Sequence, residues 1–127
     1  MSTHPRVARR EPMKLGLTSY AYRWHIREGM TVPRLFEEAA SLAAEVVQIA
    51  ENISLDGVPL DEMKDLGGHA KGLGLAVELG IADPAPAEWL QHLERCRAFD
   101  ARILRAIIDG KNGYANPAAA ADGLGAL

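Results

Sequence analysis

The first apolar run of the sequence ends in a cluster of aromatic and polar side chains. Tyr20, Tyr22, Trp24 and His25 follow one another closely, although the whole chain contains only 2 Trp and 3 Tyr. Each of these side chains combines a flat ring, which can stack on a ligand, with a polar atom that can form a hydrogen bond. In parallel α/β proteins, ligand sites are built from loops at the carboxyl ends of the strands. We therefore expect this loop to belong to a binding site.

A second group of polar residues interrupts the apolar runs that follow. Thr18, Gln48, Glu78 and Arg105 each fall near the middle or the end of one run. Strands covered by helices on both faces are nearly continuous apolar runs, and an unpaired amide or charge is costly to bury. Because side chains alternate along a strand, the apolar face belongs against helices and the polar face lines a different space. We expect that space to be the interior of a barrel.

The interior polar residues allow two interpretations. Glu78 and Arg105 lie on consecutive predicted strands, so an ion pair between them is a natural hypothesis. The four polar residues either form a structural hydrogen-bond network only, or combine that role with contacts to a ligand at the carboxyl ends of the strands.

The elements that position these residues are four strands alternating with four helices. The strands are predicted at residues 13–21, 45–50, 75–79 and 103–108. Helix starts are indicated by Thr31 as an N-cap, by Pro59, by Pro84 with Pro86, and by the pair Asn116–Pro117. The unit repeats every 27 to 32 residues, close to the period of an eightfold barrel of about 250 residues. The predicted fold class is α/β, with four consecutive βα units and parallel strands, which is half of a (β/α)8 TIM barrel.

The third predicted helix contains the single cysteine of the chain. We expect Leu90, Leu93 and either Cys96 or Arg97 on its inner side, with Trp89 beside them. One cysteine permits no internal disulfide and fits a reducing, cytoplasmic location. We interpret Cys96 as a small core residue rather than a nucleophile.

Charge and hydropathy exclude two classes of partner. The net charge of −3 gives no electrostatic footprint for nucleic acid or an anionic membrane surface. No apolar stretch reaches the roughly 18 residues that a membrane-spanning helix needs. Residues 1–12 lack the apolar segment of a signal peptide and are predicted to form a disordered basic tail. Residues 13–127 then form the half-barrel, which we expect to be truncated within its fourth helix.

Four short motifs, taken in order, resemble those of a known family. They are Ser19–Trp24, Gln48–Asn52, Glu78–Gly80 and Arg105. On these motifs the chain resembles the N-terminal half of the sugar phosphate isomerase/epimerase family, whose fold is the xylose isomerase-like TIM barrel. The resemblance implies an enzyme that binds a divalent metal (Mn, Mg, Co or Zn) and moves a proton between neighbouring carbons of a sugar. It also implies metal ligands on strands five to eight, so this chain alone is expected to bind no metal. Glu51, Glu78 and Asp109 could in principle hold a hard cation, but strand alternation directs Glu51 away from the side of Glu78.

The resemblance also implies a set of substrate-binding residues. They are Tyr20, Tyr22, Trp24, His25, Asn52, Glu78 and Arg105. The aromatic members would form one wall of the sugar pocket, because aromatic faces pack on the C–H surface of a sugar while polar tips bond its hydroxyls. The others would bind hydroxyls, a carbonyl or a phosphate. The alternatives are that Tyr22 and Trp24 only cap the barrel end or pack under the first helix, and that His25 is an ordinary loop histidine. No residue is assigned a catalytic role.

Three functions remain open on these grounds. The first is the N-terminal portion of a sugar isomerase or epimerase, inactive alone. The second is a non-catalytic half-barrel that pairs with a separate C-terminal half, or with itself, through its open strand edges. The third is a free-standing four-stranded α/β module that binds a small molecule. The expected partners are a sugar or sugar phosphate and the missing half-barrel or a second copy, with no nucleic acid and no membrane.

Overall fold

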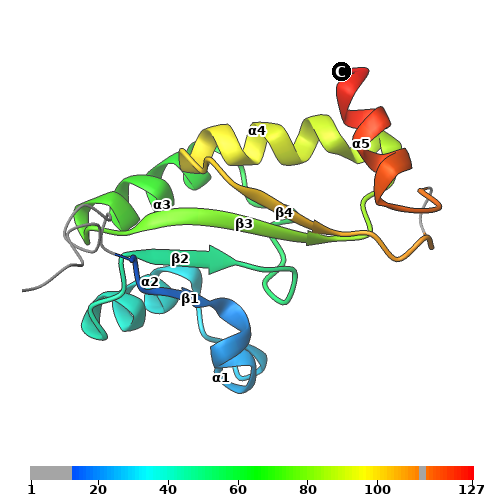
Figure 1. Ribbon diagram of the computed structural model, residues 1–127. Helices are drawn as coiled ribbons and strands as arrows, with labels where there is room; N and C mark the ends of the chain where they lie inside the picture. The colour runs from blue at the N-terminus through cyan, green and yellow to red at the C-terminus, as the bar shows by residue number, and fades with distance from the viewer. Residues whose placement is uncertain (1–12, 112–113) are drawn as a thin grey trace, which may run out of the picture.

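A single parallel sheet with a helix after each strand forms the protein (Figure 1). The computed structural model describes residues 13–111 and 114–127. The strands are β1 (Gly16–Thr18), β2 (Val46–Ile49), β3 (Ala76–Ala82) and β4 (Leu104–Ile107). They lie in the order β1-β2-β3-β4, each parallel to its neighbour. The predicted α/β fold of four βα units is therefore confirmed, while the predicted tail at residues 1–12 lies outside the described residues.

Helices and short 3-10 turns connect the strands. In chain order they are η2 (Ser19–Tyr22), α1 (Arg23–Arg27), α2 (Val32–Ser41), α3 (Leu60–Gly72), η3 (Pro86–Glu88), α4 (Trp89–Phe99) and α5 (Pro117–Gly125). Within the part of the chain that the structure describes, no helix is both long and apolar enough to cross a membrane.

Two of the predicted helix starts are confirmed by capping hydrogen bonds. The hydroxyl of Thr31 accepts a hydrogen bond from the backbone N–H of Arg34 at 3.4 Å, and Asn116 Oδ1 accepts one from the backbone N–H of Ala119 at 2.9 Å. Both side chains satisfy a free donor in the first helical turn. Gly74 follows α3 with a φ of 77°, the left-handed conformation that ends many helices.

Two strands differ from their predicted bounds by more than one residue at an end. The first, predicted at residues 13–21, is shorter because the chain enters a 3-10 turn at Ser19. The Ser19 hydroxyl accepts a hydrogen bond from the backbone N–H of Ala50 at 2.9 Å, which replaces a strand-to-strand bond. The third strand, predicted to end at residue 79, continues to Ala82 because that residue pairs with Ile107 on β4.

The core lies between the sheet and helices α2, α3 and α4. Its largest members are apolar side chains with at most 5% of their surface exposed: Leu35, Phe36, Val47, Ile49, Met63, Val77, Leu79 and Phe99. The strand residues in this set alternate with Gln48 and Glu78, which are only partly buried. The helices therefore cover the apolar face of the sheet and leave the polar face open.

A glycine marks the closest approach of α3 to α4. A Cβ atom at Gly67 would lie 3.1 Å from the Cα atom of Phe99 and 3.2 Å from its carbonyl oxygen. Sequence reasoning offers no physical account of a glycine pair inside α3, and the helix contact supplies one for Gly67. Gly68 faces open space, so only one of the two glycines is required by packing.

The predicted inner side of α4 is confirmed for Cys96, which is 7% exposed, but it is wrong for the two leucines. Leu90 and Leu93 are 60% and 39% exposed, whereas Trp89 is 3% exposed. The phase of the helix follows Trp89, whose indole N–H donates a hydrogen bond of 2.7 Å to the hydroxyl of Tyr114. His92 and Cys96, three and seven residues after Trp89, lie on the same face of the helix. Both side chains are therefore buried.

Candidate functional site

Three polar side chains form one layer on the open face of the sheet. Thr18, Gln48 and Glu78 are direct partners in the strand register. The Thr18 hydroxyl donates to Gln48 Oε1 at 3.4 Å, and Gln48 Nε2 donates to Glu78 Oε1 at 3.5 Å. A hollow of about 470 Å³ is lined by these residues on this face. The expectation that the polar residues point away from the helices is confirmed.

Arg105 joins this layer from β4, but its ion-pair partner is not the one predicted. Its Nε donates to Gln48 Oε1 at 3.3 Å, and its Nη2 lies 3.2 Å from Glu51 Oε2. The hypothesis of a pair with Glu78 is therefore wrong. Arg105 reaches β2 by crossing β3 above Gly80, where an added Cβ would lie 2.7 Å from its Nη2 atom. The absence of a side chain at Gly80 allows this path.

Glu51 links Arg105 to the aromatic loop and was missed as a site residue. Its Oε1 atom accepts a hydrogen bond of 2.6 Å from the hydroxyl of Tyr20, while Oε2 binds Arg105. Strict alternation along the predicted strand places Glu51 on the side opposite Gln48. The strand ends at Ile49, however, and the chain turns there, so alternation no longer applies. The sequence feature that could have identified Glu51 is its position just after the predicted strand, at the end where ligands bind.

The contacts of Glu51 and Tyr20 shift the pKa of each group. Burial alone would raise the pKa of Glu51, but the hydrogen bond from Tyr20 and the charge of Arg105 outweigh it and lower the pKa below its ordinary value. The hydrogen bond to Glu51 raises the pKa of Tyr20. Both shifts favour an ionised carboxylate and a neutral phenol, so the cluster of Tyr20, Glu51 and Arg105 carries one full negative and one full positive charge at neutral pH.

Asn52 forms two hydrogen bonds to Ser19, the first residue after β1. Its Oδ1 atom accepts a short hydrogen bond from the hydroxyl of Ser19, and its Nδ2 atom donates to the carbonyl oxygen of Ser19 at 3.2 Å. Ser19 is fully buried. The pair ties the end of β1 to the loop after β2, which holds Tyr20 and Glu51 at their bonding distance. Asn52 thus has a clear positioning role in this structure.

The other predicted aromatic site residues occupy two different surroundings. Tyr22 is half-buried and packs against the helix-side core, with its ring 5.8 Å from the ring of His25 in an edge-on arrangement. Trp24 is 60% exposed on α1, and the guanidinium groups of Arg23 and Arg27 lie 5.2 and 5.4 Å from its ring centre. Of the four predicted aromatic residues, Tyr20 is the one that hydrogen-bonds to the polar cluster.

The open face does not fit a divalent metal centre. Across residues 13–111 and 114–127, no group of three or more His, Cys, Asp or Glu side chains converges as metal ligands would. Both carboxylate oxygens of Glu51 are already bonded, to Tyr20 and to Arg105. The arrangement instead offers a carboxylate, an amide, a phenol and a guanidinium on one open surface, which suits hydrogen bonding to hydroxyl, carbonyl or anionic groups.

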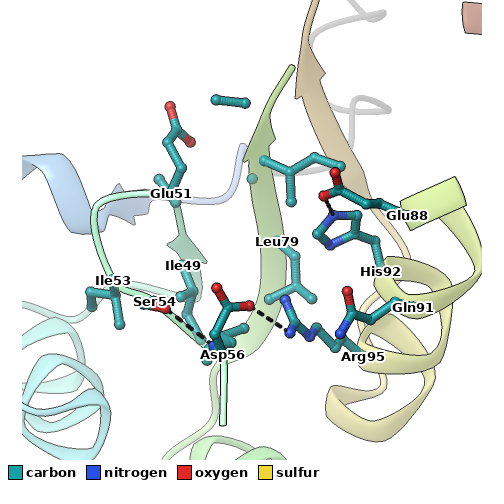
Figure 2. Close-up of a pocket in the computed structure, with 15 residues that line it drawn as sticks. Ile49, Glu51, Ile53, Ser54, Asp56, Leu79, Glu88, Gln91, His92 and Arg95 are labelled. Carbon is teal, nitrogen blue, oxygen red and sulfur yellow. Dashed lines mark hydrogen bonds and ion pairs between the residues drawn. The ribbon is translucent and has the colours of Figure 1, made fainter. Parts of the chain in front are cut away.

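A smaller cleft lies on the other side of Glu51, between the loop after β2 and helix α4 (Figure 2). It has a volume of about 220 Å³. Arg95 Nη2 donates to Asp56 Oδ1 at 2.9 Å, and His92 Nε2 lies 3.7 Å from Glu88 Oε2. Burial, followed by the nearby charge of Arg95, lowers the pKa of His92. The ion pair across the cleft fastens the loop to α4.

Comparison with proteins of known sequence finds a partial relative. The chain is 28% identical over 101 residues to a 3-oxo-isoapionate decarboxylase of Pectobacterium atrosepticum. The match covers 76% of this chain and 37% of that protein. No protein-family model matches the chain.

Comparison with solved structures shows the same barrel fold. D-psicose 3-epimerase of Clostridium cellulolyticum H10, crystallised with D-tagatose, superposes with a TM-score of 0.61 at 20% identity, covering 74% of this chain and 37% of that one. A D-psicose 3-epimerase crystallised in the presence of D-fructose gives 0.63 at 16% identity, covering 89% and 45%. This chain spans less than half the length of each of these proteins. At these identities the likeness shows the fold, which is four βα units of a TIM barrel.

Proposed function

We propose that this chain contributes the first half-barrel and one wall of the ligand site in a sugar (phosphate) isomerase or epimerase. The observation that carries the proposal is the hydrogen-bonded cluster of Tyr20, Glu51, Arg105 and Gln48 at the carboxyl ends of the strands. Ligands of TIM barrels bind at that end. The two similar structures are D-psicose 3-epimerases studied with D-tagatose or D-fructose, and these names support a sugar as the ligand class.

The chemistry of the cluster indicates what each member would do. The Arg105 guanidinium offers paired donors to a carbonyl, carboxylate or phosphate oxygen. Glu78 and Gln48 offer acceptors to sugar hydroxyls, and Tyr20 offers the edge of a ring that is 42% exposed. Trp24 and His25, exposed on α1, would extend this wall. A divalent metal and the groups that move the proton would come from residues beyond this chain.

Ketose binding can be followed through Trp24. The other tryptophan, Trp89, is buried, with 3% of its surface exposed. The substitution Trp89→Phe therefore leaves Trp24 as the only tryptophan that contributes to the fluorescence. We expect D-fructose or D-tagatose to change the emission of the Trp89→Phe chain in a saturable manner, and glycerol at equal concentration to have no such effect. An emission that changes linearly, or not at all, would contradict the proposal.

A matched pair of arginine variants tests the residue assignment. Arg105→Gln should weaken the apparent ketose affinity at least about tenfold, because one good charged hydrogen bond is worth roughly 1.5–3 kcal/mol. Arg97→Gln removes the same charge from an exposed position on α4 and should leave the affinity unchanged. Equal effects of the two substitutions would show that the response reports net charge rather than the cluster.

Self-association is the second candidate function, and the open edges of the sheet favour it. Each of β1 and β4 has a single hydrogen-bonded neighbour. Ile103 and Ile107, which flank Arg105 at two-residue spacing, are 52% and 46% exposed. In a two-fold assembly, β4 could pair in parallel with β1 of a second copy. Light scattering should then give twice the chain mass, and Ile107→Glu should restore the monomer; a monomer at every concentration rules this candidate out.

A further inference from the structure

Two carboxylates meet at the carboxyl ends of β3 and β4, outside the cluster described above. Asp83 directly follows β3, and its backbone N–H donates to the carbonyl oxygen of Ile107 at 2.6 Å. Asp109 follows β4 by two residues. The backbone N–H of Lys111 donates to both side chains, to Asp83 Oδ2 at 3.1 Å and to Asp109 Oδ1 at 3.0 Å. A shared donor at these distances requires the two carboxylates to converge.

Asp83 is buried and incompletely paired. It is only 6% exposed, so more than nine-tenths of the residue is removed from water. Its Oδ1 atom is the one fully buried side-chain oxygen or nitrogen without a hydrogen-bond partner among residues 13–111 and 114–127. A buried carboxylate oxygen without a proton donor or a cation is strongly disfavoured. The structure therefore needs an explanation for this atom.

The second carboxylate increases the demand for positive charge. Lys111 Nζ lies 3.7 Å from Asp109 Oδ2, on a side chain that is 80% exposed. Such an exposed pair contributes little. The Lys111 ammonium group pairs with Asp109 and not with Asp83, so Asp83 Oδ1 still has no partner.

We propose that Asp83 and Asp109 form a binding site for a hard divalent cation, with Mg²⁺ as the natural occupant. Hard cations prefer carboxylate oxygens, and Mg²⁺ is usually held by one or two carboxylates while it keeps several waters. Asp83 Oδ1 and Asp109 Oδ2 are the oxygens that the Lys111 N–H leaves free. The cation would join the end of β3 to the end of β4 and so brace the carboxyl edge of the sheet.

This site is separate from the metal centre that the family resemblance implies. It uses strands three and four, and the structure gives neither Asp83 nor Asp109 a hydrogen bond to Tyr20, Glu51 or Arg105 within the described residues. It also differs from the expectation that this chain alone binds no metal. The cation proposal does not depend on the ketose experiments, because the two sites use different residues. A failure to bind a cation would likewise not contradict the proposed sugar site.

The test uses the complete, metal-stripped chain and a paramagnetic stand-in for Mg²⁺. In ¹H–¹⁵N spectra, Mn²⁺ should selectively broaden the amide signals of Asp83, Asp109 and Lys111, and excess Mg²⁺ should restore them. With two carboxylates only, we expect a Kd on the order of 10⁻³ M, at the weak end of protein cation sites. Broadening centred elsewhere, or none at these three amides, would overturn the proposal.

Matched aspartate variants complete the test. Asp83→Asn keeps the shape and the acceptor for Lys111 but removes the charge, and it should weaken Mn²⁺ binding at least tenfold. Asp100→Asn is the control, because Asp100 shares the left-handed backbone of Asp83 but is exposed at the end of α4. If Asp83→Asn does not fold, Asp109→Asn, on a partly exposed loop residue, should show the same loss. Unchanged binding in the folded variant would refute the site.

Discussion

Glu51 and Arg105 organise the open face of the sheet through a small number of specific contacts. Arg105 crosses a whole strand to bind Gln48 and Glu51, and Glu51 in turn accepts a hydrogen bond from the hydroxyl of Tyr20. These bonds connect the ends of β1, β2 and β4 in one network. Because each bond depends on the position of the next, a change at one residue should be felt across the cluster.

Gly80→Ala tests the path of Arg105. The added methyl carbon would lie 2.7 Å from Arg105 Nη2, so the flexible guanidinium must move away from Gln48 and Glu51. We expect a small loss of stability, about 1 kcal/mol or less, with a several-fold loss of ketose affinity in the Trp24 assay. Combining Gly80→Ala with Arg105→Gln should add nothing to the affinity loss of Arg105→Gln alone. Additive losses would show that the two residues act separately.

His92 predicts a pH dependence of stability. Its pKa is lowered, first by burial and then by Arg95, so below its ordinary value of 6.5 the unfolded chain binds the proton more readily than the folded chain. The free energy of unfolding should therefore fall as the pH drops through 6.5. Urea unfolding at pH 7.5 and pH 5.5 should show a smaller difference in His92→Gln than in the unmodified chain. His25→Gln, on exposed α1, is the control and should keep the full difference.

At the level of elements, α3 and α4 approach each other closely at Gly67, next to the backbone of Phe99. Gly67→Ala should destabilise the protein by about 1–3 kcal/mol, because the new methyl group would push against the backbone of Phe99. Gly68→Ala, one residue further on and facing open space, should instead stabilise the helix by up to about 1 kcal/mol. Chemical denaturation of the two variants measures both values. A neutral Gly67→Ala would mean that the helices separate without cost.

The elements were largely predictable from sequence, because strand and helix patterns are local. One polar residue in each apolar run was enough to place Gln48 and Glu78 on the face away from the helices. The phase of α4 was not predictable, since it depends on a tertiary hydrogen bond between Trp89 and Tyr114. The two leucines of α4 were therefore placed on the wrong side, and the inward position of His92 was missed.

The site was predictable only in part, for a related reason. Tyr20 and Arg105 were expected at the carboxyl ends of the strands, and the structure brings them to the same carboxylate. That carboxylate, Glu51, lies where β2 has already ended, and alternation along a strand says nothing about a residue in the following turn. The partner of Arg105 could therefore not be deduced from strand spacing.

At the scale of the whole molecule, the four strands form one parallel sheet (Figure 1). Helices pack on its apolar face, and the other face carries the polar residues. The solved structures that share this fold are more than twice as long as the matched part. In a complete barrel the open polar face would line the interior, and the edge strands β1 and β4 would pair with further strands. The central claim is therefore that Gln48 and Glu78 face a ligand-accessible interior, whereas Val47 and Val77 face the helices.

Thiol labelling tests this claim most directly. The natural Cys96 is buried, so a maleimide should report on thiols introduced by Gln48→Cys and, for comparison, Val47→Cys. We predict that the Gln48→Cys chain reacts quickly, that a saturating ketose slows this reaction, and that the Val47→Cys chain reacts only as fast as it unfolds. Equal labelling rates for the two variants, or a Gln48→Cys rate that the ketose leaves unchanged, would contradict the account.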